Sequence, residues 1–517
     1  MRLFAPLSLA MAASAATFPF EETTIDQLHA GLKANEITVQ GIVEHYLERI
    51  DALNHKGPHL NGVIETATTA LDVAKQQDKA TSSPKGILHG IPILLKANIA
   101  TKGDGLTACA GSLAMEGNIA PEDAFVVKKL REAGAIILGH ANMVEWANWR
   151  SISGGIPWSA RGGITKNPYV LTAPTSGSSS GSAVSVAANM IPVSIGTETG
   201  MHPSKISGSI TSPSNRHSVV GLKPTVGLVS RSGIVPLSLR QDSPGPVGRT
   251  VRDVALVLEV IAGHDPKDAQ SKDVVVPKYS QSLQTNSNPF KNLRIAISKE
   301  ANSVTNGMLQ AHVDALAKAI QWFEANGATI VYAPLPNAKK IADSKCEYAL
   351  LQSDFREDID SYLSTLTWKT GVPPMKSLKD ITDYNTAHPD TELKVLDQSL
   401  MLASLAAPSR NNQSYIDLLK QCNDLAVTNG IDKYFKDTHA DVIVAVTDAW
   451  GNGPESPGYP GIAGYPILTV PLSYVYSIPF GLSFVGQAFT EEKLLQYGYA
   501  FEQANKARIP PTYLSGK

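Results

Sequence analysis

Residues 176–182 read Ser-Gly-Ser-Ser-Ser-Gly-Ser. A run of this composition is typical of a flexible linker. Here apolar sequence follows at once, first in residues 183–188 and again in residues 191–196. The pattern therefore predicts a tight loop that opens a buried helix, followed by a buried strand. Such a loop can direct several backbone N–H groups and hydroxyls at one point, which is how a nucleophilic serine or an oxyanion is held.

The overall composition is that of a folded protein. The chain has 517 residues, of which 43% are hydrophobic and 18% charged, and its net charge is −2. These values exclude a disordered protein and give no electrostatic reason to expect nucleic acid as a partner. The length suits two or three average domains or one large α/β body.

Helix and strand patterns alternate along much of the chain. Residues 22–54 carry helical signals, residues 86–96 form an apolar strand pattern ending in lysine, and a helix over 124–133 precedes a strand over 135–139. The alternation resumes with a strand at 293–297, a helix at 313–326, and strands at 329–332, 441–446 and 467–471. This order predicts an α/β layered fold.

The first fifteen residues resemble a secretory signal peptide. They combine one basic residue, a short apolar stretch and an Ala13-x-Ala15 ending, with cleavage expected after Ala15. The alternative is an ordinary N-terminal helix, which Pro6 disfavours. No later segment is long and apolar enough to cross a bilayer. The sequence therefore predicts a secreted or secretory-pathway protein.

The cysteines are few and widely spaced. Cys109, Cys346 and Cys422 form no metal-binding pattern and define no disulfide framework, and their odd number leaves at least one thiol unpaired within the chain. Asn412-Gln413-Ser414 is a glycosylation sequon, which matters only in a secreted protein.

Lys96 is the residue of this sequence best placed to act as a base. Acyl transfer needs a nucleophile, a base and a place for negative charge on oxygen. His89 and His217 lie near motifs but have no partner pattern. Lys96 follows largely apolar residues, and desolvation at a strand end would lower its pKa from an ordinary value of about 10.4. The alternative is a lysine that extends out of the strand end into solvent.

Several further segments join Lys96 and the 176–182 loop. They are Gly90-Ile91-Pro92-Ile93-Leu94-Leu95-Lys96-x-Asn98, Asn167-Pro168, Gly196-Thr197-Glu198-Thr199-Gly200, Gly208-Ser209-Ile210, residues 220–225, residues 464–466 and residues 484–486. As a set they resemble the amidase signature family of serine hydrolases, from about residue 22 to about residue 510.

The resemblance implies a Ser-cisSer-Lys triad. Ser209 would be the nucleophile, Ser178 the bridging serine on a cis peptide bond, and Lys96 the base. Supporting residues for the relay and the oxyanion loop would be Ser179, Thr199, Gly200 and Gly208.

The resemblance also implies the architecture. We expect an α/β/α sandwich around a large mixed β-sheet, with residues 22–515 as a single domain. Its signature core would lie at about 80–260. The polar, helical pattern of residues 336–400 separately predicts a peripheral helical cover. That cover and residues 451–460 are expected to shape the acyl pocket.

The sequence departs from the family pattern at two places. Residues 201–207 intervene between Gly200 and Gly208, where the family has a continuous run. Three explanations stay open. The insert is a mistranslated genomic segment, it bulges outward and leaves the oxyanion hole intact, or it makes the chain a weak or inactive homologue. Ser204, inside this insert, is a second and less favoured nucleophile. The other departure is Ala97, where the family commonly has Asp.

The sequence thus predicts an amidase that cleaves a carboxamide through an acyl-enzyme and needs no metal or organic cofactor. Its partner would be a small-molecule amide, with no nucleic acid and no membrane span. An esterase, a non-catalytic homologue and a glutamyl-tRNA amidotransferase component remain as alternatives. The signal-like N-terminus and the absence of basic bias count against the last. Oligomeric state and acyl chain size stay open.

Overall fold

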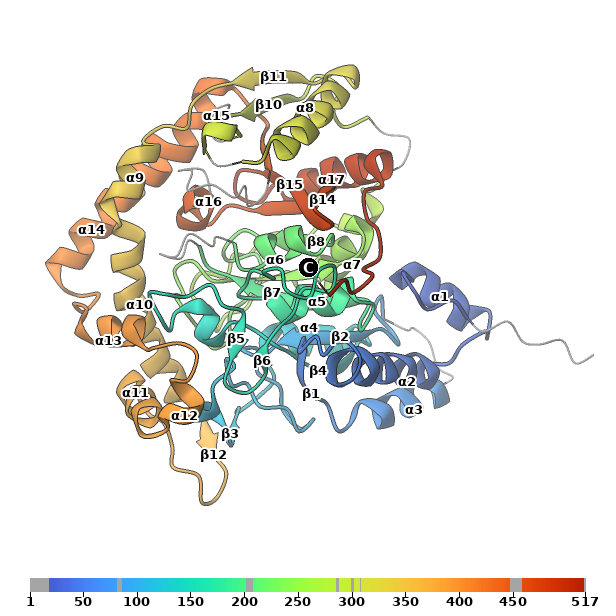
Figure 1. The fold of residues 1–517 in the computed structure, drawn as a ribbon, viewed down its shortest axis with the longest axis vertical. Helices are drawn as coiled ribbons and strands as arrows, with labels where there is room; N and C mark the ends of the chain where they lie inside the picture. The colour runs from blue at the N-terminus through green and yellow to red at the C-terminus, as the bar shows by residue number, and fades with distance from the viewer. Residues whose placement is uncertain are drawn as a thin grey trace, which may run out of the picture.

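One mixed sheet of eleven strands organises the chain (Figure 1). The computed structural model describes residues 18–80, 86–200, 208–284, 288–298, 302–306, 308–446 and 458–515. The strand order is β1-β4-β2-β7-β9-β8-β14-β15-β13-β10-β11. In Figure 1 the sheet runs from β1 near the bottom to β11 near the top. The large mixed sheet flanked by helices confirms the predicted α/β fold.

The strands of the sheet are β1 (Val63–Thr66), β2 (Pro92–Lys96), β4 (Ile136–Ala141), β7 (Val193–Glu198), β8 (Val220–Lys223), β9 (Ser243–Gly248), β10 (Arg294–Ile297), β11 (Thr329–Tyr332), β13 (Val442–Val446), β14 (Ile467–Val475) and β15 (Ile478–Val485). Two short pairs lie outside it, β3 (Asn118–Ile119) with β12 (Thr367–Trp368) and β5 (Trp158–Ser159) with β6 (Gly163–Ile164).

The α-helices are α1 (Ile25–Lys33), α2 (Val39–Ile50), α3 (Ala70–Lys79), α4 (Phe125–Glu132), α5 (Ser180–Ala187), α6 (Thr211–Arg216), α7 (Val251–Ile261), α8 (Gln310–Ala325), α9 (Ala338–Ser344), α10 (Cys346–Leu363), α11 (Leu378–Ala387), α12 (Pro389–Glu392), α13 (Ser399–Ala406), α14 (Gln413–Asn423), α15 (Asp432–Thr438), α16 (Gly458–Ala463) and α17 (Glu491–Asn505). Shorter 3₁₀ and π turns are η1 (Asp51–His55), η2 (Leu113–Met115), η3 (Glu145–Asn148), η4 (Tyr279–Gln281), η5 (Val304–Asn306) and η6 (Asp424–Ile431).

Strands β2, β7 and β9 bring three functional segments to one edge of the sheet. β2 and β7 are parallel, with Leu95 opposite Ile195, so both strands end at the same edge. β9 runs antiparallel to β7, with Ser243 opposite Glu198, so the residues before β9 lie at that edge too. Every residue of β2 and β7 is buried, as expected for central strands covered on both faces.

Helices cover both faces of the sheet. Gly245 on β9 lies against Ile210, directly before α6, whereas Gly248 lies against Val254 and Asp253 of α7. Because side chains alternate along a strand, positions three apart face opposite sides. α5 and α6 therefore lie on one face and α7 on the other, and both α5 and α7 bury apolar side chains in the core.

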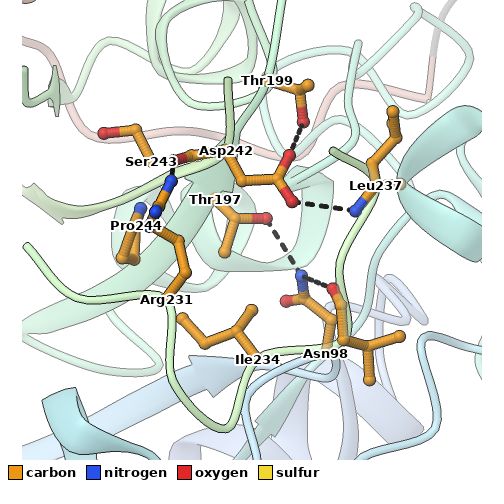
Figure 2. A pocket seen from close by; sticks show the side chains of 11 residues that line it. Asn98, Thr197, Thr199, Arg231, Ile234, Leu237, Asp242, Ser243 and Pro244 are labelled. Atoms are coloured by element: carbon orange, nitrogen blue, oxygen red, sulfur yellow. Dashed lines mark hydrogen bonds between the residues drawn. The ribbon is translucent and has the colours of Figure 1, made fainter. Parts of the chain in front are cut away.

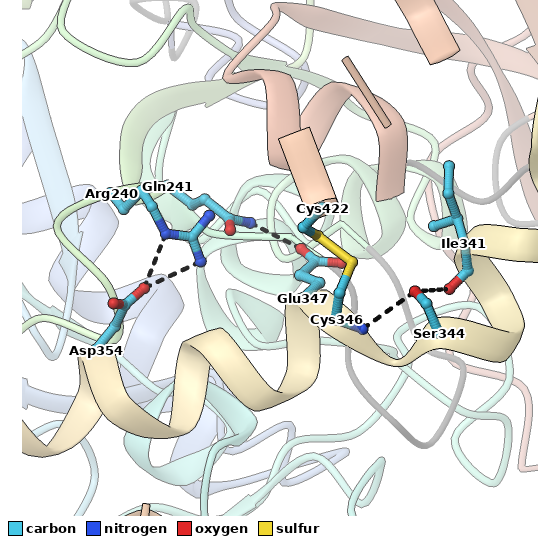
Figure 3. Close-up of a disulfide and its surroundings, with 8 residues drawn as sticks. All are labelled: Arg240, Gln241, Ile341, Ser344, Cys346, Glu347, Asp354 and Cys422. Atoms are coloured by element: carbon cyan, nitrogen blue, oxygen red, sulfur yellow. Dashed lines mark hydrogen bonds and ion pairs between the residues drawn. A yellow bond between two sulfur atoms is a disulfide. The ribbon is translucent and has the colours of Figure 1, made fainter. Parts of the chain in front are cut away.

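Helices α9 to α14 stand beside the sheet as a column at the left of Figure 1. α10 is joined to α14 by a disulfide between Cys346 and Cys422, whose Cα atoms are 5.6 Å apart (Figure 3). Cys109 is a buried free thiol. A second apolar cluster, which includes Trp146 and Phe355, packs this column against the loops that follow β4.

A buried ion triad fixes the same column. Arg150 lies between the carboxylates of Glu145 and Glu392, at 2.9 Å from Glu392 Oε2. All three side chains are at most 1% exposed. Glu392 also accepts the Leu113 backbone N–H at 2.9 Å. This charge-assisted network links α12 to the loops around the sheet edge.

The predicted buried helix and strand after the 176–182 loop are α5 and β7. The N-terminal residues 1–15 and the insert 201–207 lie outside the described residues, and the division into domains stays a prediction. Across the described part of the chain, no helix combines the length and apolar character that a membrane crossing needs.

Candidate active site

Lys96 is the last residue of β2, and its side chain is fully buried. Its amine has three polar neighbours. Nζ lies 2.7 Å from Ser178 Oγ, 2.9 Å from Thr197 Oγ1 and 3.0 Å from the Thr197 carbonyl oxygen. Strand β2 therefore places the amine against a hydroxyl of the serine-rich loop, which lies far away in the sequence.

Burial lowers the pKa of Lys96 to about 7, because the interior disfavours the charged amine. The carboxylates of Asp242 and Glu198 oppose this effect and favour the charged form. A neutral amine in contact with a serine hydroxyl can accept that hydroxyl's proton. Near neutral pH the amine is thus poised between its charged and neutral forms.

Lys223 is a second buried lysine, but its hydrogen-bond partners differ from those of Lys96. It is also fully buried, and burial lowers its pKa to about 8. Its amine donates to the backbone carbonyls of Tyr465 at 2.9 Å and Pro224 at 3.2 Å. Carbonyls have no proton to give, so this lysine serves to join β8 to the segment before β14.

Ser178 lies in the loop directly before α5 and is fully buried. The peptide bond between Gly177 and Ser178 is cis. The Ser178 carbonyl accepts the Val144 backbone N–H at 3.0 Å, which fixes the loop against the segment after β4. A side chain at Gly177 would meet Val144 Cγ2 at 2.3 Å, so only glycine fits there.

Ser179 connects the loop to β7 and to Ser209. Its hydroxyl donates to the Thr197 carbonyl and accepts the Thr197 N–H, both at 3.2 Å. Its backbone N–H donates to the Ser209 carbonyl at 2.9 Å. This one residue therefore sets the spacing between the serine-rich loop, the strand end and the Ser209 segment.

Ser209 stands just before helix α6 and is half-buried. Gly208 before it has φ of +83°, a conformation that favours glycine. The Glu198 carboxylate accepts the backbone N–H groups of Ile210 at 2.7 Å and Thr211 at 2.9 Å. Glu198 is buried at the end of β7, so it ties the Ser209 segment directly to the sheet.

Thr199 and Gly200 continue from β7. The Thr199 hydroxyl donates to Asp242 Oδ1 at 2.5 Å. Gly200 lies against Glu347 of α10, because a Cβ placed on it would be 2.2 Å from Glu347 Oε1. Gln241 Nε2 donates to the same carboxylate oxygen at 2.7 Å (Figure 3). The helical column therefore contacts Gly200, as does Gly461 of α16.

A small polar pocket lies beside Thr197, the residue whose hydroxyl contacts Lys96 (Figure 2). Its lining includes the polar residues Asn98, Thr197, Thr199, Arg231 and Asp242 and apolar residues such as Ile234. Burial raises the pKa of Asp242 to about 6, although the backbone N–H groups of Leu237 and Ser238 donate to its carboxylate. Thr197, which lines the pocket, also contacts Lys96 Nζ through its hydroxyl.

The structure brings the predicted residues Lys96 and Ser178 into direct contact, Ser179 shares the Thr197 carbonyl with Lys96, and the Ser179 N–H donates to the Ser209 carbonyl. Thr199, Gly200 and Gly208 lie in the adjoining loop ends. The sequence offers no partner pattern for His217. In the structure its Nδ1 lies 2.5 Å from the Pro213 carbonyl, and burial lowers its pKa to about 3. Ser204 and residues 451–457 lie outside the described residues.

Sequence reasoning missed Thr197, Glu198 and Asp242. The first two stand inside a quoted motif, but no pattern in the sequence assigns them partners. Asp242 directly precedes β9 and meets the site only through strand pairing. Ala97, where an acid was expected, is buried among backbone groups, and its carbonyl accepts the N–H groups of Cys109 and Ala110. Within the described ranges, no group of three His, Cys, Asp or Glu residues could hold a metal.

Comparison with known proteins identifies the family. The sequence model of the family described as Amidase matches residues 41–450. A probable amidase of Arabidopsis thaliana is 39% identical over 513 residues, which cover 96% of this chain and 93% of the relative. A glutamyl-tRNA(Gln) amidotransferase chain of Lysinibacillus sphaericus is 32% identical, over 94% of this chain and 97% of its own.

Solved structures of the same family have a similar overall fold. The X-ray structure of native peptide amidase from Stenotrophomonas maltophilia has a TM-score of 0.87 and 38% identity, and the match covers 96% of this chain and 99% of that one. An amidase family protein from Bacillus anthracis has a TM-score of 0.84 and 32% identity, over 95% of this chain and 93% of its own. The chain therefore belongs to the amidase family and is an amide-hydrolysing enzyme.

Proposed function

We propose that the protein hydrolyses carboxamides through an acyl-enzyme on Ser209, with Ser178 and Lys96 as the proton relay. The observation that carries this proposal is the 2.7 Å contact between Lys96 Nζ and Ser178 Oγ in a fully buried setting. The hydrogen bond from Ser179 N–H to the Ser209 carbonyl supports it, because it holds the Ser209 segment beside the serine-rich loop.

In the first half-reaction Ser178 takes the proton of Ser209 and passes its own proton to Lys96. Ser209 Oγ attacks the amide carbon, and backbone N–H groups of the loop that includes Thr199, Gly200 and Gly208 stabilise the oxyanion. As the C–N bond breaks, the proton returns through Ser178 to the leaving nitrogen, which departs as ammonia or an amine. A water molecule activated by the same relay then attacks the acyl-enzyme and releases the carboxylic acid.

Peptides that end in a carboxamide are the first substrates to test, because a peptide amidase is 38% identical over nearly the whole chain. The Glu347 carboxylate beside Gly200 gives this site a polar wall from the helical column. An ester is the second substrate class, since the same acyl chemistry accepts an alcohol as leaving group. The amidotransferase relatives make glutamine-dependent amide transfer the corresponding alternative.

A catalytically impaired homologue is the competing proposal, and one specific observation favours it. Residues 201–207 interrupt the loop between Gly200 and Gly208, and loss of one oxyanion donor lowers the rate by about 100- to 1000-fold. We further propose that the chain enters the secretory pathway. Its signal-like residues 1–15 and the Cys346–Cys422 disulfide support this, because disulfides persist in oxidising compartments.

Labelling with a fluorophosphonate, followed by mass spectrometry, tests the proposal. We expect an adduct on Ser209 in the wild type and none in Ser209→Ala or Lys96→Met, with peptide amide hydrolysis lost in both variants. An adduct on Ser204 would redirect the mechanism. No adduct on a sample whose circular dichroism shows it to be folded would favour the impaired homologue.

A further inference from the structure

The direction of the Lys96 lone pair decides whether this lysine can act as a base. A neutral amine has two N–H donors and one lone pair, and here it faces three oxygens. The Thr197 carbonyl can only accept, so it takes one N–H. The second N–H and the lone pair are then divided between the hydroxyls of Thr197 and Ser178. Only if Thr197 accepts does the lone pair face Ser178.

Asn98 restricts what the Thr197 hydroxyl can do. Its Nδ2 donates to Thr197 Oγ1 at 3.1 Å and to the Val235 carbonyl at 3.4 Å. Because a carbonyl can only accept, the Val235 contact identifies this atom as the amide nitrogen. Asn98 therefore occupies one acceptor position of the Thr197 hydroxyl and leaves the other for Lys96. The hydroxyl hydrogen must then point away from both donors.

Thr197 lines the pocket shown in Figure 2, so its hydroxyl hydrogen has a cavity to enter on that side. Its cavity volume is about 10 Å³, the scale of a single water molecule. Asn98 Oδ1 has no hydrogen-bond partner among the described residues and is buried, and Asp242 lines the same cavity. One water there can accept the Thr197 hydrogen and donate to Asn98 Oδ1 and to the Asp242 carboxylate.

We propose that Thr197 is a positioning residue, whose hydroxyl, held by Asn98 and by one water in the adjoining pocket, turns the Lys96 lone pair toward Ser178. The proposal rests on the function assigned above to Lys96. It gives the polar pocket a role that needs no contact with substrate. It also gives a reason for buried polar residues such as Asn98 and Asp242 around Thr197, where apolar residues would cost less desolvation.

Replacement of Thr197 by valine tests this role in the intact protein. Thr197→Val keeps the carbonyl and the side-chain shape but removes the hydroxyl. We expect kcat to fall by about 10- to 100-fold with little change in KM, because the amine is misdirected while substrate contacts persist. The acid limb of the pH–rate profile should move to lower pH, since the charged amine loses one acceptor. Thr197→Ser keeps the hydroxyl, so it should have the wild-type kcat and the wild-type pH–rate profile.

Ser194→Ala is the matched control. Ser194 is a buried residue of the same strand, and its hydroxyl donates to the Ser182 carbonyl at 3.0 Å. This variant loses a buried hydroxyl bond without touching Lys96, so kcat and the pH profile should stay unchanged. If Thr197→Val matched this control in both measurements, the positioning role would be overturned.

A neutron diffraction structure of the wild type at alkaline pH tests the same geometry without any substrate. We expect one water in the pocket, with the Thr197 deuteron directed at it and the Ser178 deuteron directed at Lys96 Nζ. A Thr197 deuteron on the line to Lys96, or a pocket without water, would overturn the inference. A wild type that shows the expected deuterons but hydrolyses no amide would count against the proposed function instead.

Discussion

The amine of Lys96 lies 2.7 Å from the hydroxyl of Ser178, although 82 positions of sequence separate the two residues. Neither side chain is exposed, and burial lowers the pKa of Lys96 to about 7. The contact therefore joins a proton acceptor to a hydroxyl in a water-poor interior, where such interactions are stronger than in solvent. The pH dependence of the enzyme follows from this pair.

Amide hydrolysis should rise with pH through about 7. Only the neutral form of Lys96 accepts a proton, so below its pKa the rate should change by about tenfold per pH unit. Initial rates measured from about pH 5 to about pH 9 give the profile. Lys96→Arg should be inactive across this range, because guanidinium stays charged. A rate independent of pH between 5 and 7 would contradict the assignment of Lys96 as the base.

Lys96 should also make folding stability depend on pH. In the unfolded chain a lysine has a pKa of about 10.4, against about 7 in the folded protein. Between these values the unfolded state binds more protons, so the free energy of unfolding rises with pH. Relative to Lys96→Met, the wild type should gain stability as pH increases from 7 to 10, and the difference should level off on either side.

Urea denaturation of both proteins at several pH values measures this difference. A difference between wild type and Lys96→Met that did not vary with pH would show that Lys96 titrates normally in the folded state.

Local patterns of the sequence predict the elements that carry the site. Apolar residues before Lys96 and after Ser182 specify buried strand β2, helix α5 and strand β7, because burial on both faces requires near-continuous apolar sequence. The motifs around Ser178 and Ser209 identify the serine-rich loops. Their mutual distance cannot be deduced from spacing, since it depends on the order of strands in the sheet.

The residues missed in the sequence are those whose partners come from strand pairing or helix packing. Asp242 reaches the pocket only because β9 pairs antiparallel with β7. Cys346 and Cys422 are 76 positions apart, and their pairing depends on how α10 packs against α14. No local signal in the sequence encodes either contact.

Loss of the disulfide should destabilise the protein without removing a site residue. The bond closes a loop of 76 positions, for which the chain-entropy model gives about 4 kcal/mol. Cys422→Ser should therefore lower the melting temperature, and dithiothreitol should lower that of the wild type similarly. Cys109→Ser provides the control, because this free thiol takes no part in the bond. If dithiothreitol left the wild type unchanged, the disulfide would not stabilise the native state.

The ion triad predicts an order of effects among three variants. Arg150→Met leaves Glu145 and Glu392 buried without a counter-charge and should cost about 3–5 kcal/mol of unfolding free energy. Glu392→Gln leaves the Arg150–Glu145 pair intact and should cost less. Lys56→Gln breaks an exposed pair with Asp51 and should change stability by less than about 1 kcal/mol. Urea denaturation measures all three, and equal costs for Arg150→Met and Lys56→Gln would contradict the triad's role.

If residues 201–207 obstruct the oxyanion hole, as the competing proposal of an impaired homologue holds, their deletion should raise amide hydrolysis. The deletion joins Gly200 to Gly208 and restores the continuous loop of the family pattern, whose backbone N–H groups are proposed to hold the oxyanion. Recovery of one such donor corresponds to about a 100- to 1000-fold gain in kcat.

The contacts on either side of the deletion favour a productive junction. Thr199 is fixed by Asp242 and the start of α6 by Glu198, so both ends keep their anchors in the sheet. Steady-state kinetics on a peptide amide compares the two proteins, with the fluorophosphonate adduct on Ser209 as a readout of nucleophile reactivity. If the deletion variant folds and labels at the wild-type rate with no gain in kcat, the insert does not obstruct the oxyanion hole, and the natural loop is already competent.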